Sequence, residues 1–136
     1  MIKPYIGTLN ESIMKEQHQP QLAGVWMDHH HAQFIVPVDG EFSFGTKVHS
    51  GEYHGDKGEH AAMNAEKADA RKYYKTIAQH LLNYDEIYLF GPGKSQEELR
   101  NFLHEDSHFK NKRVAVGSSS HMTDHQMVAK VRDFFK

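Results

Sequence analysis

Apolar residues in the first half of the chain fall into three short runs that favour β-strands. The runs are AGVWM, AQFIVPV and EFSFGTKVH, within residues 23–49, and they are rich in β-branched and aromatic side chains. Typical turn residues separate them, at 28–31 and at 39–40. The pattern therefore predicts a three-stranded antiparallel meander.

The second half of the chain alternates helical and strand patterns. From Ala65 to Asn83 apolar residues recur at intervals of three and four, which predicts a long amphipathic helix. EIYLF at 86–90 and KRVAV at 112–116 lack alternation, which is typical of strands buried on both faces. A further helix is expected after each of these strands. The apolar positions of the three helices are, in order, Tyr74, Ile77, Ala78, Leu81 and Leu82, then Leu99, Phe102 and Leu103, then Met127, Val131 and Phe134.

Polar residues indicate where these elements begin and end. Ser95 with Glu98, and Thr123 with Gln126, match the capping box, in which two side chains satisfy backbone N–H groups at a helix start. Both later helices are therefore predicted to begin at such a box. Residues 50–64 carry three glycines and no apolar rhythm, so a long loop is expected between the meander and the first helix.

The resulting order, β-β-β-α-β-α-β-α, predicts an α/β domain of ribonuclease H-like architecture over residues 22–136. Two right-handed crossovers after a meander place the later strands beside the first, which gives a mixed five-stranded sheet of order 3-2-1-4-5 with helices on both faces. The connections leave strands one and four in opposite directions, so a ligand is expected beyond their carboxyl ends. Asp28, Gly91, Pro92 and Gly93 are predicted to share that edge.

Composition limits the classes of function. The chain has 136 residues, the size of one domain, and 16 Lys plus Arg against 18 Asp plus Glu give a formal net charge of -2. This balance predicts no general attraction to nucleic acid or membrane. Cysteine is absent and no segment approaches the roughly 20 apolar residues of a membrane span, so a cytoplasmic protein without a membrane partner is expected. Residues 1–21, with Pro4, Gly7 and Pro20, are predicted to extend outside the domain, where a second protein can bind them.

The stretch GPGKS, at 91–95, looks at first like a phosphate-binding loop. The nucleotide-binding pattern G-x-x-x-x-G-K-[ST] requires another glycine five residues before Gly93, and Tyr88 stands there. The sequence therefore predicts no nucleotide and no cofactor. The N–H groups near Lys94 and Ser95, at the start of a helix, remain a candidate position for a single anion.

Four stretches of sequence carry a resemblance to a known family. GVWMDHHHAQFIVPVDGEFSF and ADARKYYKTIAQHL resemble the middle domain of the archaeal and eukaryotic peptide-chain release factor and its relative pelota. YDEIYLFGPGKSQEELRNFL and MTDHQMVAKVRDFF are similar to bacterial relatives of these factors, including small single-domain proteins of translational-machinery or host-attachment type. The resemblance covers residues 22–136.

What the resemblance implies depends on the loop before the long helix. In the release factor this loop bears Gly-Gly-Gln, which positions water for the hydrolysis of peptidyl-tRNA. Here the loop has no such tripeptide, and Gly58-Glu59 is the nearest approach. The resemblance therefore implies a non-catalytic translation factor of stress, hibernation or rescue type, bound to the ribosome or to its rRNA or tRNA.

Contact with RNA requires positive and stacking side chains on one surface. Candidates lie in the predicted loop, on the long helix and at the glycine turn. The basic residues of the helix also have a simpler explanation, because lysines and arginines commonly form the solvated side of a helix. The candidate RNA-binding residues are Tyr53, Lys57, Arg71, Lys72, Lys75, Lys94 and Ser95.

A metal-dependent nuclease is one alternative, because enzymes of this architecture use clustered carboxylates to hold metal ions. The set is incomplete, since the fourth strand ends in glycine and proline where another acid is needed. Asp28 also has a plain structural role available, as a turn residue that caps local N–H groups. The candidate carboxylates are Asp28, Glu66 or Asp69, and Asp124.

A metal-binding or self-associating scaffold is the other alternative, because the chain contains 12 histidines. Three imidazoles and a water can hold zinc, and His49, His54 and His60 are the candidates, although their spacing matches no compact ligand signature. His121 and His125 lie one helical turn apart and can pair on a metal or simply face solvent.

Overall fold

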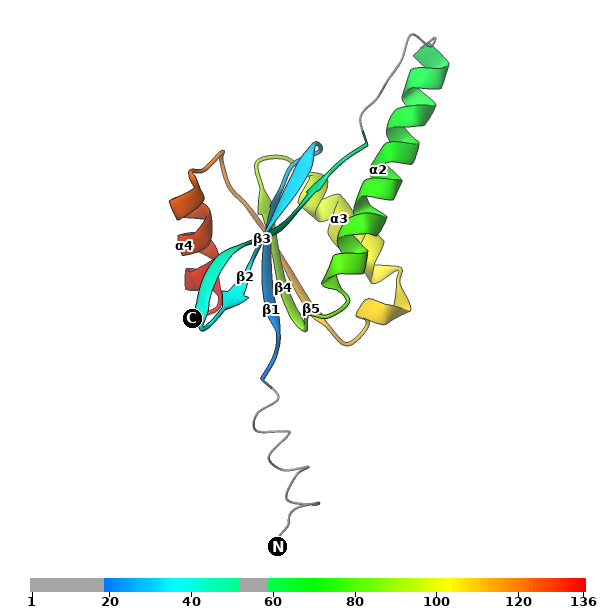
Figure 1. The fold of residues 1–136 in the computed structure, drawn as a ribbon. Coiled ribbons are helices and arrows are strands. Elements are labelled where there is room, and N and C mark those ends of the chain that lie inside the picture. Colours follow the sequence, from blue (N-terminus) through cyan, green and yellow to red (C-terminus); the bar gives the residue numbers. More distant parts are fainter. Residues whose placement is uncertain (1–18, 52–58) are drawn as a thin grey trace, which may run out of the picture.

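The protein is described by a computed structural model, which covers residues 19–51 and 59–136, except for the side chains of 59–69. Five strands form one mixed sheet, and helices lie on both of its faces (Figure 1). The elements are β1 (Leu22–Met27), β2 (His31–Val38), β3 (Glu41–His49), α2 (Glu59–Leu81), β4 (Glu86–Gly91), α3 (Ser95–His104), the 3₁₀ helix η1 (Ser107–Phe109), β5 (Arg113–Ser118) and α4 (Asp124–Phe134).

The strand order is β3-β2-β1-β4-β5, which confirms the predicted topology. β1 pairs with β2 in the antiparallel direction and with β4 in the parallel direction, where Val25 lies opposite Leu89 and Trp26 opposite Phe90. The two crossover helices, α2 and α3, cover one face of the sheet, and α4 covers the other (Figure 1). Residues that follow β1 and β4 are thereby brought to the same edge.

The hydrophobic core has two parts because side chains of a strand alternate between the two faces of the sheet. Under α2 and α3 the core contains Val25 and Leu89 from the central strands, with Leu99 from α3. Under α4 it contains Trp26 and Val131. The buried side chains of the α2–α3 face are Ala23, Val25, Met27, Ala32, Phe34, Val48, Tyr73, Tyr74, Ile77, Ala78, Leu81, Ile87, Leu89, Leu99, Leu103 and Phe109.

Helix α2 begins at Glu59, six residues before the predicted start at Ala65, so it takes up part of the predicted loop. The sequence between these positions includes two alanines, and alanine is the strongest helix-forming residue. The spacing of apolar residues alone did not indicate this earlier start of the helix. The helix ends at Leu81, and Leu82 is exposed rather than part of the buried stripe. Its 23 residues span about 35 Å at 1.5 Å per residue, and the N-terminal part projects beyond the sheet (Figure 1).

The two predicted capping boxes have different outcomes. Thr123 and Gln126 form a complete box at the start of α4, as predicted. The box of Ser95 and Glu98 is wrong: Lys94 is the N-cap residue of α3 and makes no side-chain capping bond. Ser95 lies already inside the first turn and is fully buried, so its side chain is not at the cap position.

Strand β5 and the end of helix α4 are less buried than predicted. The central residues of β5, at 114–116, are only half-buried, because β5 is an edge strand with a single neighbour. Phe134, the last predicted core position of α4, is exposed on one side while Val131 of the same helix is buried. The predicted stripe of α3 is confirmed for Leu99 and Leu103.

We expect the close approach of β1 and β4 at Gly91 to be essential for stability. A Cβ atom placed on Gly91 would lie 1.9 Å from the carbonyl oxygen of Met27, so Gly91→Ala forces the two strands apart. The expected loss is roughly 2–4 kcal/mol in the free energy of unfolding, measured by urea denaturation.

The matched control is Gly93→Ala, because no atom lies within 4 Å of a Cβ at Gly93. That variant should change the free energy of unfolding by no more than about 0.5 kcal/mol. Equal losses in the two variants would show that the loop conformation, and not the contact between strands, sets the requirement for glycine.

Candidate nucleic-acid interface

The carboxyl ends of the parallel strands form a polar edge that we call the rim. It comprises residues 28–31, 49–51, 91–96 and 117–121. Asp28 directly follows β1, and Gly91 ends the neighbouring strand β4. The predicted meeting of Asp28 with the Gly91-Pro92-Gly93 turn at one edge therefore follows from the observed pairing.

The Asp28 carboxylate shapes the turn between β1 and β2. Its Oδ1 atom accepts hydrogen bonds from the backbone N–H groups of His30, at 2.8 Å, and His31, at 2.9 Å. Burial alone would raise the pKa of Asp28, but these N–H groups and the attraction of His31 outweigh it and lower the pKa below its usual value. Asp28 thus has the turn-capping role that its sequence position allowed.

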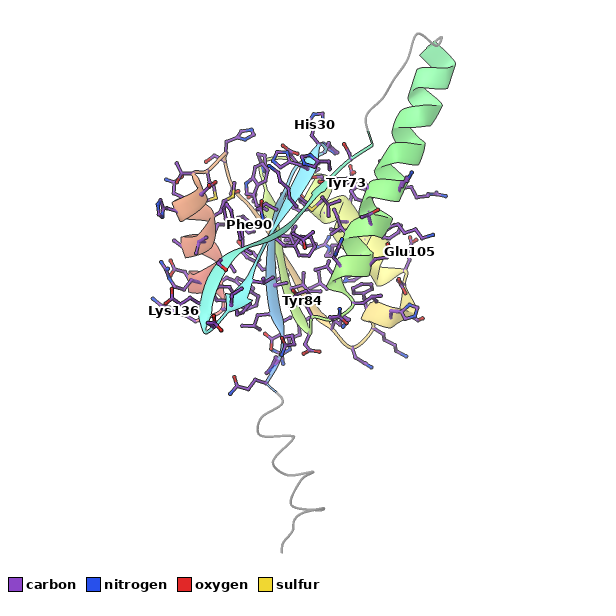
Figure 2. The ribbon with its side chains drawn as sticks, viewed as in Figure 1. His30, Tyr73, Tyr84, Phe90, Glu105 and Lys136 are labelled. Atoms are coloured by element: carbon purple, nitrogen blue, oxygen red, sulfur yellow. The ribbon has the colours of Figure 1, made fainter. Side chains whose placement is uncertain are left out.

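Helix α2 is fixed to the rim through Tyr73. Its hydroxyl donates a hydrogen bond to the backbone oxygen of Asp28 at 2.9 Å, so the helix touches the turn that contains His30 (Figure 2). Burial, with the Asp28 charge nearby, raises the pKa of Tyr73 far above its usual value, so the hydroxyl keeps its proton. The role of Tyr73 was not predicted, because its place one residue before the expected apolar position Tyr74 gave no sign of a partner.

A second tyrosine fixes α2 to helix α3. The Tyr74 hydroxyl donates to Oε1 of Glu98 at 2.5 Å, and Nε2 of His29 lies 3.6 Å from the same oxygen. Burial and this hydrogen bond raise the pKa of Tyr74. The turn after β1, helix α2 and helix α3 therefore meet at one carboxylate, which sets the direction in which the N-terminal part of α2 projects.

Gln96 fills the space between the ends of β4 and β5. Its side-chain Nε2 donates to the backbone oxygens of Gly91 at 2.9 Å, Gly93 at 2.9 Å and Gly117 at 3.2 Å, and the residue is fully buried. The N–H of Ser119 also donates to the oxygen of Gly91, at 2.9 Å. These bonds join the ends of β4 and β5, next to the β1–β4 switch point where open α/β sheets commonly bind ligands.

The predicted RNA-binding residues divide into three groups. Arg71, Lys72 and Lys75 are exposed on α2, in the same stretch of helix as the buried Tyr73 that contacts the rim. Lys94 is exposed at the rim itself, whereas the neighbouring Ser95 is buried and its Oγ atom has no hydrogen-bond partner among the described residues. Tyr53 and Lys57 lie outside the described residues.

Six of the described histidines lie in the rim or within four residues of it in the sequence. The ring of His31 lies 5.3 Å from that of Trp26 and 6.2 Å from that of His49, its partner across the β2–β3 ladder. Burial, followed by Lys47 and His49, lowers the pKa of His31, although Asp28 acts in the opposite direction. The six histidines are His29, His30, His31, His49, His121 and His125.

The metal-dependent alternatives gain no support from the described residues. Across 19–51 and 59–136, apart from the side chains of 59–69, no three His, Asp or Glu residues are arranged to hold a metal ion. Of the predicted zinc set, His49 is exposed, and the side chains of His54 and His60 lie outside the described part, as do those of Glu66 and Asp69. Asp124 is exposed in the first turn of α4.

The fold is similar to that of known translation proteins. Pelota from Archaeoglobus fulgidus aligns with a TM-score of 0.58 and 13% identity, over 97% of this chain and 38% of Pelota. The archaeal translation termination factor aRF1 aligns with a TM-score of 0.53 and 11% identity, over 95% of this chain and 37% of aRF1. Archaeal Pelota, in a ribosome-bound assembly with ABCE1, aligns with a TM-score of 0.53 and 17% identity, over 96% of this chain and 38% of Pelota.

These likenesses show a shared fold alone. The sequence identities are all below one fifth, which is too low to show a shared function. The chain spans less than two fifths of the length of each of these proteins. No family model and no curated protein matches the sequence. Within the described residues, no helix is long and apolar enough to cross a membrane.

We expect Asp28→Ala to destabilise the protein by about 1–2 kcal/mol at pH 7, because two N–H groups of the turn lose their acceptor. The lowered pKa of Asp28 means that this stabilisation is present above the unfolded pKa of about 3.9 and is lost as the pH falls through the folded value. Urea denaturation at pH 7 and pH 3 should therefore show a smaller difference between wild type and variant at pH 3.

Asp28→Asn is the matched control, because it retains an acceptor oxygen and lacks the charge. It should lose less stability than Asp28→Ala at pH 7. A difference between wild type and Asp28→Ala that is the same at both pH values would contradict the role of the charged form.

Proposed function

We propose that this chain is a non-catalytic translation factor of stress, hibernation or rescue type. It binds the ribosome, through rRNA or a bound tRNA, using the rim and the exposed side of α2. The observation that carries the proposal is a long helix, α2, that Tyr73 fixes to the rim and Tyr74 fixes to α3, and that exposes Arg71, Lys72 and Lys75 to solvent.

The charges on α2 suit a phosphate backbone. Arg71 and Lys75 are four residues apart and Lys72 and Lys75 three apart, so neighbouring turns of one helix present these cations to solvent. Lys94 adds another exposed cation at the rim. A local basic surface is needed because the whole chain has a net charge of -2, which gives no general attraction to RNA.

The shared fold supports the same class of partner. Pelota, which has this fold in one part of its chain, is found bound to the ribosome with ABCE1 in archaea. The residues that resemble release factors and pelota extend through the long helix and the rim. By analogy with those proteins, we propose the ribosome as the partner of this chain.

A binding role rather than hydrolysis is inferred from the sequence at the start of α2. The Gly-Gly-Gln tripeptide of the release factor is missing, and Gly58-Glu59 places a carboxylate where the neutral amide would stand. A carboxylate repels RNA phosphates, whereas an amide does not. The proposed activity is therefore occupancy of a ribosomal site without cleavage of peptidyl-tRNA.

The proposal is tested by sedimenting the purified protein with ribosomes from its own host. Wild type should pellet with ribosomes. The triple variant Arg71→Glu, Lys72→Glu and Lys75→Glu should bind at least roughly tenfold more weakly, because three phosphate contacts become repulsive. Raising the salt concentration should also weaken the binding of the wild-type protein to ribosomes.

The control is Lys110→Glu with Arg132→Glu, two exposed residues away from the rim. This variant should bind as wild type does. Absence of wild-type binding to ribosomes from both growing and stationary-phase cells would overturn the proposed function, and equal losses in both variants would remove α2 as the contact surface.

A further inference from the structure

Four aromatic side chains of the rim and of β1 and β3 lie together, and we call them the histidine cluster. The ring centroid of Trp26 lies 5.3 Å from that of His31 and 5.8 Å from that of His121. The ring centroid of His49 lies 6.2 Å from that of His31. The cluster therefore joins three neighbouring strands, β1, β2 and β3, to the connection between β5 and α4.

The cluster lies at the surface, although its tryptophan does not. Trp26 is only 2% exposed, whereas His31 is half-buried and His49 and His121 are exposed. Residues 119–123 form the connection between β5 and α4 and have neither helix nor strand structure. Met122 in this connection packs against the same part of the core as Trp26. The indole is thus covered in part by an irregular segment at the surface.

Two buried polar atoms, one on each side of this contact, have no hydrogen-bond partner among the described residues. They are Nε1 of Trp26 and Oγ of Ser119. A buried donor without a partner costs free energy, and contact with water would supply one to each atom. The packed arrangement therefore carries a cost that movement of the connection would remove.

The protonation of His31 acts against the packed arrangement. Burial lowers the pKa of His31, and Lys47 and His49 act in the same direction, whereas the nearby Asp28 opposes them. Because the packed state lowers this pKa, its stability relative to a state with an exposed His31 ring falls as the pH drops below about 6.5. Acid therefore favours a state in which the cluster has separated.

The surroundings of the cluster offer limited compensation for new positive charge. Oδ1 of Asp28 lies 3.6 Å from Nδ1 of His31, but the same oxygen already accepts two hydrogen bonds from the turn. The other groups that act on His31 are positive or can become so. The charged or titratable groups on the elements around the cluster are Asp28 and His30 in the turn after β1, Lys47 and His49 on β3, and Asp124 and His125 at the start of α4.

We propose that the histidine cluster is a pH-sensitive switch on the rim. With neutral imidazoles, the connection between β5 and α4 stays packed on Trp26. When His31, His49 and His121 take up protons, their positive charges repel one another, the connection moves away and the indole becomes exposed to water. The rim gains positive charge in the same step. This inference does not depend on ribosome binding, since the switch belongs to the domain itself.

The fluorescence of Trp26 tests the switch directly, because the chain has one tryptophan. Quenching by acrylamide measures how far the indole is exposed to solvent. From about pH 8 to about pH 5, the quenching constant of the wild-type protein should rise roughly threefold or more, because the population of the exposed form increases. The far-UV circular dichroism spectrum should be the same at both pH values.

Phenylalanine substitutions separate the charge of the cluster from its packing, because phenylalanine keeps a ring beside Trp26 and takes up no proton. The double variant His31→Phe with His121→Phe should give the same low quenching constant at both pH values. His121→Phe alone changes an exposed side chain, and its quenching constant should rise less than that of wild type. The matched control is His104→Phe at the exposed end of α3, which should behave as wild type does.

Three results would overturn the proposal. The first is a quenching constant of the wild-type protein that does not change with pH. The second is an equal rise in wild type and in the double variant, because acid would then expose Trp26 without the histidines. The third is a loss of fluorescence intensity at an unchanged quenching constant, because the charged rings would then quench the indole without releasing the connection.

Discussion

The parallel contact between β1 and β4 is the constraint on which the rest of the structure depends. It brings the turn after β1 against the glycine turn after β4, and Gly91 is needed because the backbone of Met27 is so close. Among the described residues the two halves of the chain share no other strand pairing, since β3 and β5 lie at the edges of the sheet. The rim exists only because this one pair of strands joins a meander to a pair of crossovers.

Side-chain hydroxyls then convert the rim into a support for the projecting helix. Tyr73 and Tyr74 bond to two different elements, the β1–β2 turn and helix α3, so α2 cannot rotate about either contact alone. Burial disfavours the ionised form of both hydroxyls, which keeps them hydrogen-bond donors over the physiological pH range. The basic residues beside them therefore keep a defined position relative to Lys94.

Local patterns predicted the fold better than they predicted the site. The alternation of short strands and helices, the box of Thr123 with Gln126 and the turn at Asp28 were readable because each depends on neighbours within a few residues. The contacts of Tyr73 and Gln96 could not be predicted in this way, because they join distant parts of the sequence. Tyr73 bonds to a residue 45 positions away, and Gln96 bonds to residues up to 21 positions away. Ser95 misled for the same reason, since its burial is decided by the packing of α3 and not by its local motif.

The amide of Gln96 has a consequence for how the protein recognises a partner. By bonding three carbonyl oxygens it ties the end of β4, the glycine turn and the end of β5 together. An edge held by such internal hydrogen bonds would meet the proposed partner as a rigid body, and the entropy lost on association would be confined mainly to long surface side chains. Affinity can then be adjusted through a few exposed cations without altering the interior.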